Sequence, residues 1–293
     1  MADRYLTTSE VADYLRLKER KVYDLVASAG IPHARITGKL LFPQSLIDLW
    51  VDRHVVGPDG PLRAPPPIVA GSSDPLLEWA LTEAGTGLAR LPGGSEDGMT
   101  RIAEGAAVLA GLHLLDVASG DYNVPAVRRR LGLGDVVLVH WARRRQGLVV
   151  SRGNPFGVSG IADLCRPPLR IILRKEGAGS GLLLDHLLAA EGIARSDLCA
   201  APDHAATEEE VGAAIIEGRA DVGLAIEAVA RRTGLDFLPL RQECYDLLLR
   251  RRDYFEAPLQ RLFAFVRTEG FAARARTLGG YDVAEAGAIR YNA

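Results

Sequence analysis

A proline-rich stretch near the start of the chain divides the sequence into two parts of different character. Residues 55–67, VVGPDGPLRAPPP, hold five prolines and two glycines. Proline lacks a backbone donor and has a fixed φ, so this stretch resists helix formation and favours an extended spacer. We therefore predict a small domain over residues 1–54, a linker over 55–67 and a larger domain over 68–293.

Composition excludes several classes of protein. The net charge of -2 gives no overall attraction to nucleic acid, so any DNA contact must come from a local patch. The three cysteines are far apart in the sequence and indicate neither a disulfide framework nor a zinc site. No apolar run approaches the length of a membrane span, and the start MADRYLTTSEVADYL lacks a signal-peptide pattern. We expect a cytoplasmic protein.

The first 54 residues follow the pattern of a winged helix-turn-helix. Cap residues 7–10, TTSE, open one helix, and a second is expected over 19–29, where apolar residues recur at helical spacing. A short hairpin then turns at 37–39, TGK, and Pro43 starts a last helix. The segments TTSEVADYL, ERKVYDLVASAGIPHARI and GKLLFPQSLIDLWV, within residues 5–51, resemble the excisionase branch of the MerR-type DNA-binding domains. This resemblance implies double-stranded DNA as a partner and a homodimer acting on two half-sites.

Basic side chains lie where such a domain touches DNA. A recognition helix points its first residues into the major groove, and a wing reaches the minor groove or the phosphates. The candidate contacts are Lys18, Arg20 and Lys21 at the start of the second helix, Tyr23 within it, and Arg35 and Lys39 on the wing. Two alternatives remain open: these side chains are ordinary solvated charges, or the unit docks another protein.

The larger part alternates apolar strands with amphipathic helices, which predicts an α/β fold. Small polar loops join strand to helix at Ser72-Ser73, at 93–95 and at 177–181, and a turn at 218–221 leads into a strand and then a helix. Free backbone amides at a helix N-terminus form a natural anion site, and glycine lets the backbone approach a ligand closely.

A second resemblance covers about residues 68–250. The segments GSSDPLL, GGSEDG, GLHLLD, DYNVPAV, QGLVVSRGNP, EGAGSGLLLDHLL, GRADVGLAIEAVA and FLPLRQECYDLLL resemble the cytoplasmic solute-binding-protein-like domain related to periplasmic molybdate- and tungstate-binding proteins. The resemblance implies a bilobed type II periplasmic-binding-protein-like fold with its ligand in the cleft. It places lobe 1 at about 68–118 and 240–293, lobe 2 at about 124–238, and the two crossings near 117–124 and 239–246.

The same resemblance implies which residues contact the ligand. They are Ser72 or Ser73 in the first loop, Ser95 in the second, Ser180 with Gly181 in the third, and Ile226 in the fourth. Molybdate or tungstate is the ligand it suggests. The third loop departs from the Ser-Gly-Thr-Arg run common in this family, because Leu182 follows Gly181. This departure leaves room for a small organic acid or a cofactor fragment.

Physical reasoning leaves a plain alternative beside the anion site. Serine is a frequent helix cap, so each of these serines can be explained without a ligand. A site without an acidic acceptor favours a fully deprotonated oxyanion over one that retains a proton. We expect Asp74 and Glu96, which would repel an anion, to point outward, and we interpret residues 143–145, RRR, as a solvated turn between two strands.

The motifs do not indicate an enzyme. The glycine loop at 177–181 lacks the third glycine of a dinucleotide site, and the chain has no phosphate-binding P-loop and no nucleophile elbow. The six histidines show no metal-ligand spacing, although His113 is expected at a strand near the cleft. We therefore expect no catalytic or metal site. The favoured function is a transcriptional regulator that senses a small anion, and the alternative of another class is an anion storage or delivery protein that does not bind DNA.

Overall fold

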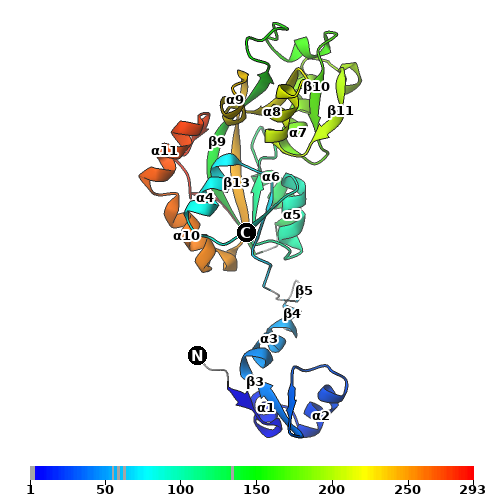
Figure 1. Ribbon diagram of the computed structural model, residues 1–293, viewed down its shortest axis with the longest axis vertical. Helices are drawn as coiled ribbons and strands as arrows, with labels where there is room; N and C mark the ends of the chain where they lie inside the picture. Colours follow the sequence, from blue (N-terminus) through cyan, green and yellow to red (C-terminus); the bar gives the residue numbers. More distant parts are fainter. Residues whose placement is uncertain (1–3, 55, 58–59, 62–63, 133–134) are drawn as a thin grey trace. The chain divides into compact units, whose positions relative to one another are not determined.

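The computed structural model describes residues 4–54, 56–57, 60–61, 64–132 and 135–293 (Figure 1). The chain forms two compact units, Met1–Ala64 and Pro65–Ala293. The expected linker over 55–67 lies partly outside the described residues. Two short strands, β4 (Val56–Gly57) and β5 (Gly60–Pro61), pair within it.

The N-terminal unit is the winged helix-turn-helix that its sequence pattern predicts. Thr7 and Glu10 form a reciprocal capping box that starts the first helix. The side chains of Val11, Val22 and Phe42 are fully buried in a small core shared by helices and hairpin. Its elements are β1 (Tyr5–Leu6), α1 (Thr8–Tyr14), α2 (Glu19–Ala27), β2 (Ala34–Ile36), β3 (Lys39–Pro43) and α3 (Gln44–His54).

The larger unit is built on one mixed sheet with the strand order β11-β10-β12-β9-β13-β8-β6-β7. Its strands are β6 (Ile68–Gly71), β7 (Ala89–Pro92), β8 (Leu109–Leu112), β9 (Val136–Val150), β10 (Ile171–Arg174), β11 (Ala200–Ala205), β12 (Val222–Ile226) and β13 (Asp236–Arg250). Two short strands near the chain end, β14 (Tyr281–Asp282) and β15 (Ile289–Asn292), also pair with β9. This is the α/β binding-protein fold that was expected.

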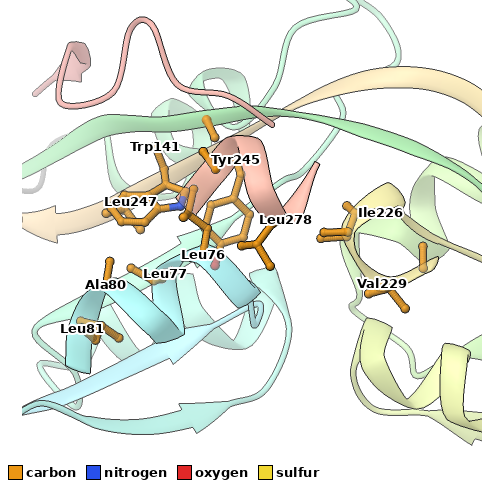
Figure 2. Packing of buried hydrophobic residues seen from close by; sticks show 14 of the residues in the cluster. Leu76, Leu77, Ala80, Leu81, Trp141, Ile226, Val229, Tyr245, Leu247 and Leu278 are labelled. Atoms are coloured by element: carbon orange, nitrogen blue, oxygen red, sulfur yellow. The ribbon is translucent and has the colours of Figure 1, made fainter. Parts of the chain in front are cut away.

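Helices cover both faces of this sheet, and the alternation of side chains explains why. Val69, Val139 and Leu247 pack under α4, α10 and α11, whereas their neighbours along the strands join a second cluster under α5 and α6. Figure 2 shows the first cluster reaching from α4 across Trp141 and Tyr245 to Ile226. The helices of this unit are α4 (Pro75–Glu83), α5 (Ser95–Ala103), α6 (Val124–Leu131), α7 (Gly179–Ala190), α8 (Glu208–Ile216), α9 (Glu227–Thr233), α10 (Ala257–Phe265) and α11 (Glu269–Leu278).

Two long strands, β9 and β13, join the two lobes. The first part of β9 pairs with the lobe 1 end of β13, and its last five residues pair with β12 of lobe 2 (Figure 1). The second crossing, predicted at 239–246, lies within β13 and coincides with two breaks in its pairing register. Irregularities of this kind allow a strand to bend, and these two lie where the lobes meet.

The first crossing was placed too early. Residues 117–124 stay in lobe 1, because Leu115 bridges to Tyr122 and the following helix α6 packs its Val127 against lobe 1. The crossing takes place inside β9. Residues 143–145 are therefore part of this continuous strand, and the interpretation of them as a solvated turn was wrong.

Candidate functional site

The first predicted loop follows β6 and leads into α4. The hydroxyl of Ser72 lies 2.8 Å from His113 Nε2, and Asp74 caps α4 by accepting a hydrogen bond from Leu77 N at 2.7 Å. Asp74 is fully buried, contrary to the expectation that it points outward, whereas Glu96 is exposed as expected. The chain's own carboxylate therefore already occupies the N-terminus of α4.

The second and third loops place serines inside the first turns of α5 and α7. The Oγ of Ser95 accepts a hydrogen bond from His113 N at 3.1 Å, and Ser180 Oγ accepts one from Arg174 Nη1 at 3.1 Å. Both serines are fully buried. Within the part of the chain that the structure describes, no side chain caps α5 or α7. The helix-cap alternative is thus wrong for Ser72 and Ser95, whose hydroxyls bond elsewhere.

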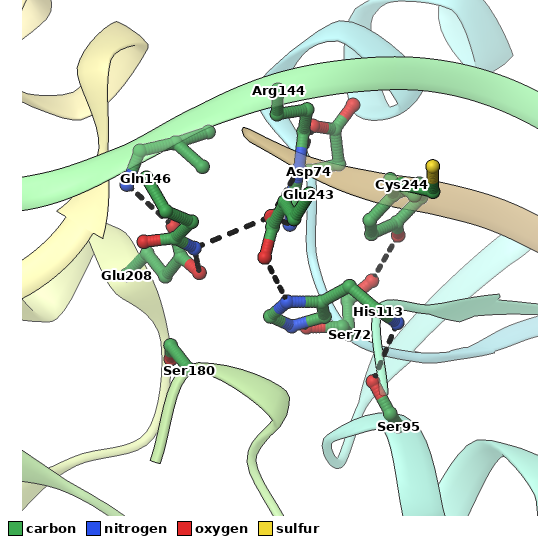
Figure 3. Close-up of polar contacts among 12 residues, drawn as sticks. Ser72, Asp74, Ser95, His113, Arg144, Gln146, Ser180, Glu208, Glu243 and Cys244 are labelled. Carbon is green, nitrogen blue, oxygen red and sulfur yellow. Dashed lines mark hydrogen bonds and ion pairs between the residues drawn. The ribbon is translucent and has the colours of Figure 1, made fainter. Parts of the chain in front are cut away.

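These loops, distant in sequence, converge on His113. A Cβ at Gly94 would lie 3.1 Å from Gly177 O, so the loop before α5 touches the loop before α7. A Cβ at Gly179 would lie 2.6 Å from the carbonyl oxygen of His113, so only glycine allows this approach. Figure 3 shows Ser72, Ser95 and His113 from lobe 1 with Ser180 of lobe 2 across from them.

His113 connects the loops to a buried ion-pair network. Its Nδ1 lies 2.9 Å from Glu243 Oε2, and Arg144 Nε donates to Glu243 Oε1 at 2.8 Å while its Nη1 reaches Asp74 Oδ2 at 3.0 Å. Burial alone would raise the pKa of the Glu243 carboxyl, but the charges of Arg144 and His113 lower that pKa to about 2. Because the ionised Glu243 carboxylate can only accept, the proton of this hydrogen bond lies on His113 Nδ1, whereas the hydrogen bond between Nε2 and the Ser72 hydroxyl can run in either direction.

A second buried carboxylate, Glu208, lies on the lobe 2 side. Its Oε1 accepts from Gln146 Nε2 at 2.8 Å (Figure 3), and its Oε2 accepts from the backbone amide of Ile226 at 2.8 Å. Arg174 Nη1 is 3.8 Å from Glu208. The amide predicted to hold the ligand at the fourth loop is therefore bonded to a carboxylate of the protein.

In the part of the chain that the structure describes, two other predicted ligand contacts, Gly181 and Ser73, are not shown donating a hydrogen bond toward His113. Gly181 N donates to Ala178 O at 3.0 Å, inside the first turn of α7. Ser73 is half-buried and lines a cavity of about 20 Å³ together with Ser72, Asp74 and Arg90. Of the predicted residues, Ser72 and Ser95 bond to His113, and Ser180 follows Gly179, the residue of the third loop that approaches the His113 carbonyl. Ile226 contributes its side chain to the apolar core.

Sequence reasoning missed the charged groups of the site. Arg144 is 1% exposed, although Arg143 and Arg145 on either side of it are exposed. The signal that could have found it is the strand period of two, which places Arg144 and Gln146 on one face. No comparable signal marked Glu208, because it belongs to a run of three glutamates, residues 208–210, that looks like an ordinary acidic first turn of a helix.

One group of side chains has the composition of a metal site. Ligand atoms of His113, Glu208 and Glu243 lie within 4.8 Å of one another. The guanidinium of Arg144 already neutralises Glu243, and a dication there would be repelled by it. Network geometry therefore favours hydrogen bonding over metal binding at these three residues.

The N-terminal unit presents its candidate DNA contacts at the surface. Lys18, Arg20 and Lys21 are exposed, with Lys18 at the N-cap position of α2. An open groove of about 780 Å³ separates α2 from the wing, and Tyr23, Arg35 and Lys39 all line it. The structure thus brings the wing residues and Tyr23 to one face.

Comparison with known proteins identifies both units. The model of the PBP superfamily domain matches residues 78–267, more than half of the chain, and a helix-turn-helix domain model matches residues 5–55. The chain therefore belongs to the PBP superfamily. Together, its helix-turn-helix domain and its binding-protein domain fit a DNA-binding regulator that binds a small ligand.

Similar proteins include one curated relative and two solved structures. Uncharacterized protein YvgK of Bacillus subtilis (strain 168) is 28% identical over 302 residues, covering 97% of this chain and 96% of YvgK. A Clostridium perfringens protein assigned as a phosphate ABC transporter substrate-binding protein, solved with bound phosphate, has a TM-score of 0.53 at 11% identity, covering 72% of this chain and 96% of its own. OxyR of Corynebacterium glutamicum, a hydrogen peroxide-bound Cys→Ser variant, has a TM-score of 0.50 at 14% identity, covering 92% of this chain and 91% of its own. The two structures support the fold.

Among the described residues, none of the helices has the length and apolar character needed to cross a membrane.

Proposed function

We propose that this protein is a transcriptional regulator that binds DNA through its N-terminal unit and a small anion between the lobes of its larger unit. The observation that carries the proposal is the meeting of two uncapped helix starts, α5 of lobe 1 and α7 of lobe 2, beside His113. Amides at a helix N-terminus favour negative charge, and two of them facing one point can hold an anion without a cation.

The hydroxyls add to this argument. Ser95 Oγ accepts from His113 N, and Ser180 Oγ accepts from Arg174, so each keeps its own proton to donate. Ser72, by contrast, already shares a hydrogen bond with His113 Nε2. Two buried hydroxyl donors with two helix starts supply the hydrogen bonds that a small anion requires when it leaves water.

The ligand is proposed on chemistry and resemblance together. Molybdate and tungstate are the first anions to test, because the sequence resembles that branch of binding proteins. A small organic acid is the second candidate, favoured by Leu182, which stands where an arginine-bearing loop would supply further donors. Leu182 is partly exposed on α7 and adds an apolar surface instead.

Lobe closure links the ligand to DNA in this proposal. A ligand that contacts α5 and α7 stabilises the closed arrangement, and β9 and β13 are the strands about which the lobes move. In a homodimer, this change alters the spacing of two DNA-binding units. The ligand acts only to the extent that it binds one arrangement more tightly than the other.

Calorimetric titration tests the ligand site. Molybdate, tungstate, sulfate, phosphate and small carboxylates are titrated into the wild-type protein and into Ser95→Ala. Loss of one charge-assisted hydrogen bond should weaken binding about tenfold or more. Ser196→Ala, an exposed serine of lobe 2, is the matched control and should bind as wild type. Absence of binding by every anion at millimolar concentration would refute the anion site.

A DNA-shift assay with genomic upstream fragments separates the regulator from the storage or delivery protein. A regulator retards particular fragments at moderate salt, and the ligand changes that retardation. A storage protein binds the anion and retards no fragment. The alternative in which the N-terminal unit mediates protein assembly predicts that second result.

A further inference from the structure

The candidate ligand site contains acceptors as well as donors. Glu208 is 3% exposed and Glu243 is 1% exposed, and both carboxylates lie within 4.8 Å of a His113 ring nitrogen. A site without an acidic acceptor would suit a fully deprotonated oxyanion. This site has two carboxylates, so that condition does not hold.

Glu208 keeps spare capacity to accept. It starts α8 behind the cap residue Thr207, and its two oxygens each take one neutral donor, from Gln146 Nε2 and from Ile226 N, both at 2.8 Å. Each carboxylate oxygen offers two lone pairs, so both oxygens can accept again. Arg174, at 3.8 Å, is beyond hydrogen-bond distance.

An independent observation comes from Gln146. Its amide nitrogen donates to Glu208 at 2.8 Å and to Glu243 at 3.3 Å, which fixes the orientation of the amide, because the flipped form would set its oxygen against two carboxylates. Gln146 is fully buried, and its Oε1 has no partner among the described residues. A buried polar atom without a partner is costly, so this oxygen is a second acceptor in need of a donor.

We propose that the ligand is an anion that carries its own hydrogen-bond donor, with its negative charge toward α5 and α7 and its donor toward Glu208. The inference rests on the proposed function and narrows its ligand class. A fully deprotonated oxyanion would meet Glu208 as a like charge with no hydrogen bond to offset the repulsion. A monohydrogen oxyanion such as hydrogen phosphate, or an α-amino acid, offers the O–H or N–H that the site accepts.

A divalent metal is the competing way to satisfy the same acceptors. The geometry disfavours it, because Arg144 already holds Glu243 at 2.8 Å and the Nδ1 proton of His113 points at the same carboxylate. A metal would have to displace that proton and lie beside a guanidinium. The metal is therefore an outcome to be tested, by titrating with and without a chelator.

The test compares anions matched in shape. Phosphate and sulfate are titrated calorimetrically into the full chain at a pH where phosphate keeps one proton and sulfate keeps none. Alanine and pyruvate form a second pair that differs in the α-amino donor. We expect the donor-bearing member of at least one pair to bind about tenfold or more tightly than its partner.

Variants then assign the preference to one residue. Glu208→Gln should reduce the ratio of affinities within the preferred pair by about tenfold, because an amide accepts less strongly and does not repel the second anion. Glu217→Gln, the same substitution on an exposed glutamate at the end of α8, should keep the wild-type ratio. Thermal unfolding shows whether both variants fold. If Glu208→Gln fails to fold, the ratio of affinities within each anion pair, measured on the wild type, still decides the proposal.

Each other outcome overturns a defined claim. If sulfate binds as tightly as phosphate and pyruvate as tightly as alanine, the inference is contradicted and the anion site stands. Molybdate binding as tight as that of the preferred donor-bearing anion would contradict it in the same way. If Glu208→Gln increases the affinity for both members of a pair equally, Glu208 only repels anions and does not accept a hydrogen bond from the ligand. If a chelator abolishes anion binding, a metal ion and not a donor of the ligand satisfies the carboxylates. If nothing binds, the proposed function fails first.

Discussion

Arg144 shows how one residue can organise a site. Its guanidinium lies between the carboxylates of Asp74 and Glu243 and over the ring of Tyr245, 4.3 Å from the ring centroid. Arg144→Met would leave two buried carboxylates without a cation, which costs about 3–5 kcal/mol in comparable proteins. Urea unfolding measures this, with Arg143→Met, an exposed neighbour, expected to change stability by less than about 1 kcal/mol. Similar changes in the free energy of unfolding for the two variants would contradict the stabilising role of Arg144.

Glu243 makes the stability of the larger unit depend on pH. Its pKa is lowered from 4.5 to about 2 in the folded protein, because Arg144 and His113 outweigh the effect of burial, which would raise it. A depressed folded pKa contributes stability that is complete above the unfolded value and is lost as the pH falls toward 2. The wild type should therefore exceed Glu243→Gln in stability at pH 6, and the difference should shrink between pH 4.5 and 2. Urea midpoints across this range test it, and a constant difference would refute the assignment.

At the scale of elements, local patterns predicted the helices and strands well. The capping box at Thr7, the glycine turn at Gly38 and the strand-loop-helix units are all present, because each depends on residues close in sequence. The errors concern pairing. Residues 143–145 were interpreted as a turn because charge usually marks solvent, and the partners that bury Arg144 come from distant parts of the chain. The convergence on His113 could be inferred only from resemblance.

The recognition helix α2 can be tested as an element. Arg20→Ala combined with Lys21→Ala should weaken DNA binding and reduce its salt dependence, because each phosphate contact releases counterions. Fluorescence anisotropy at several salt concentrations measures both quantities. Arg276→Ala, an exposed arginine of the other unit, is the control and should match wild type. An unchanged salt slope in the double variant would exclude these residues from the DNA interface.

At the scale of the whole molecule, the boundary between the units predicts how a protease cuts the chain. Exposed connections are the preferred sites of nicking, so limited proteolysis should cleave first within residues 55–67. The product should be a stable fragment beginning near Ile68 that still binds the anion. Mass spectrometry identifies the first cut, and cleavage within residues 80–240 before the linker would argue against two independent units.

The central claim is that a ligand in the larger unit controls DNA binding by the smaller one. Its most direct test measures the Kd for a retarded upstream fragment by fluorescence anisotropy, without and with saturating amounts of the tightest-binding anion of the calorimetric panel. Coupling between two sites of a regulator typically changes affinity by about 5- to 150-fold. The account predicts that the anion changes the Kd for DNA within this range for the wild type. For Ser95→Ala, at an anion concentration too low to fill its weakened site, the Kd for DNA should not change. An identical Kd with and without an anion that calorimetry shows to be bound would contradict it.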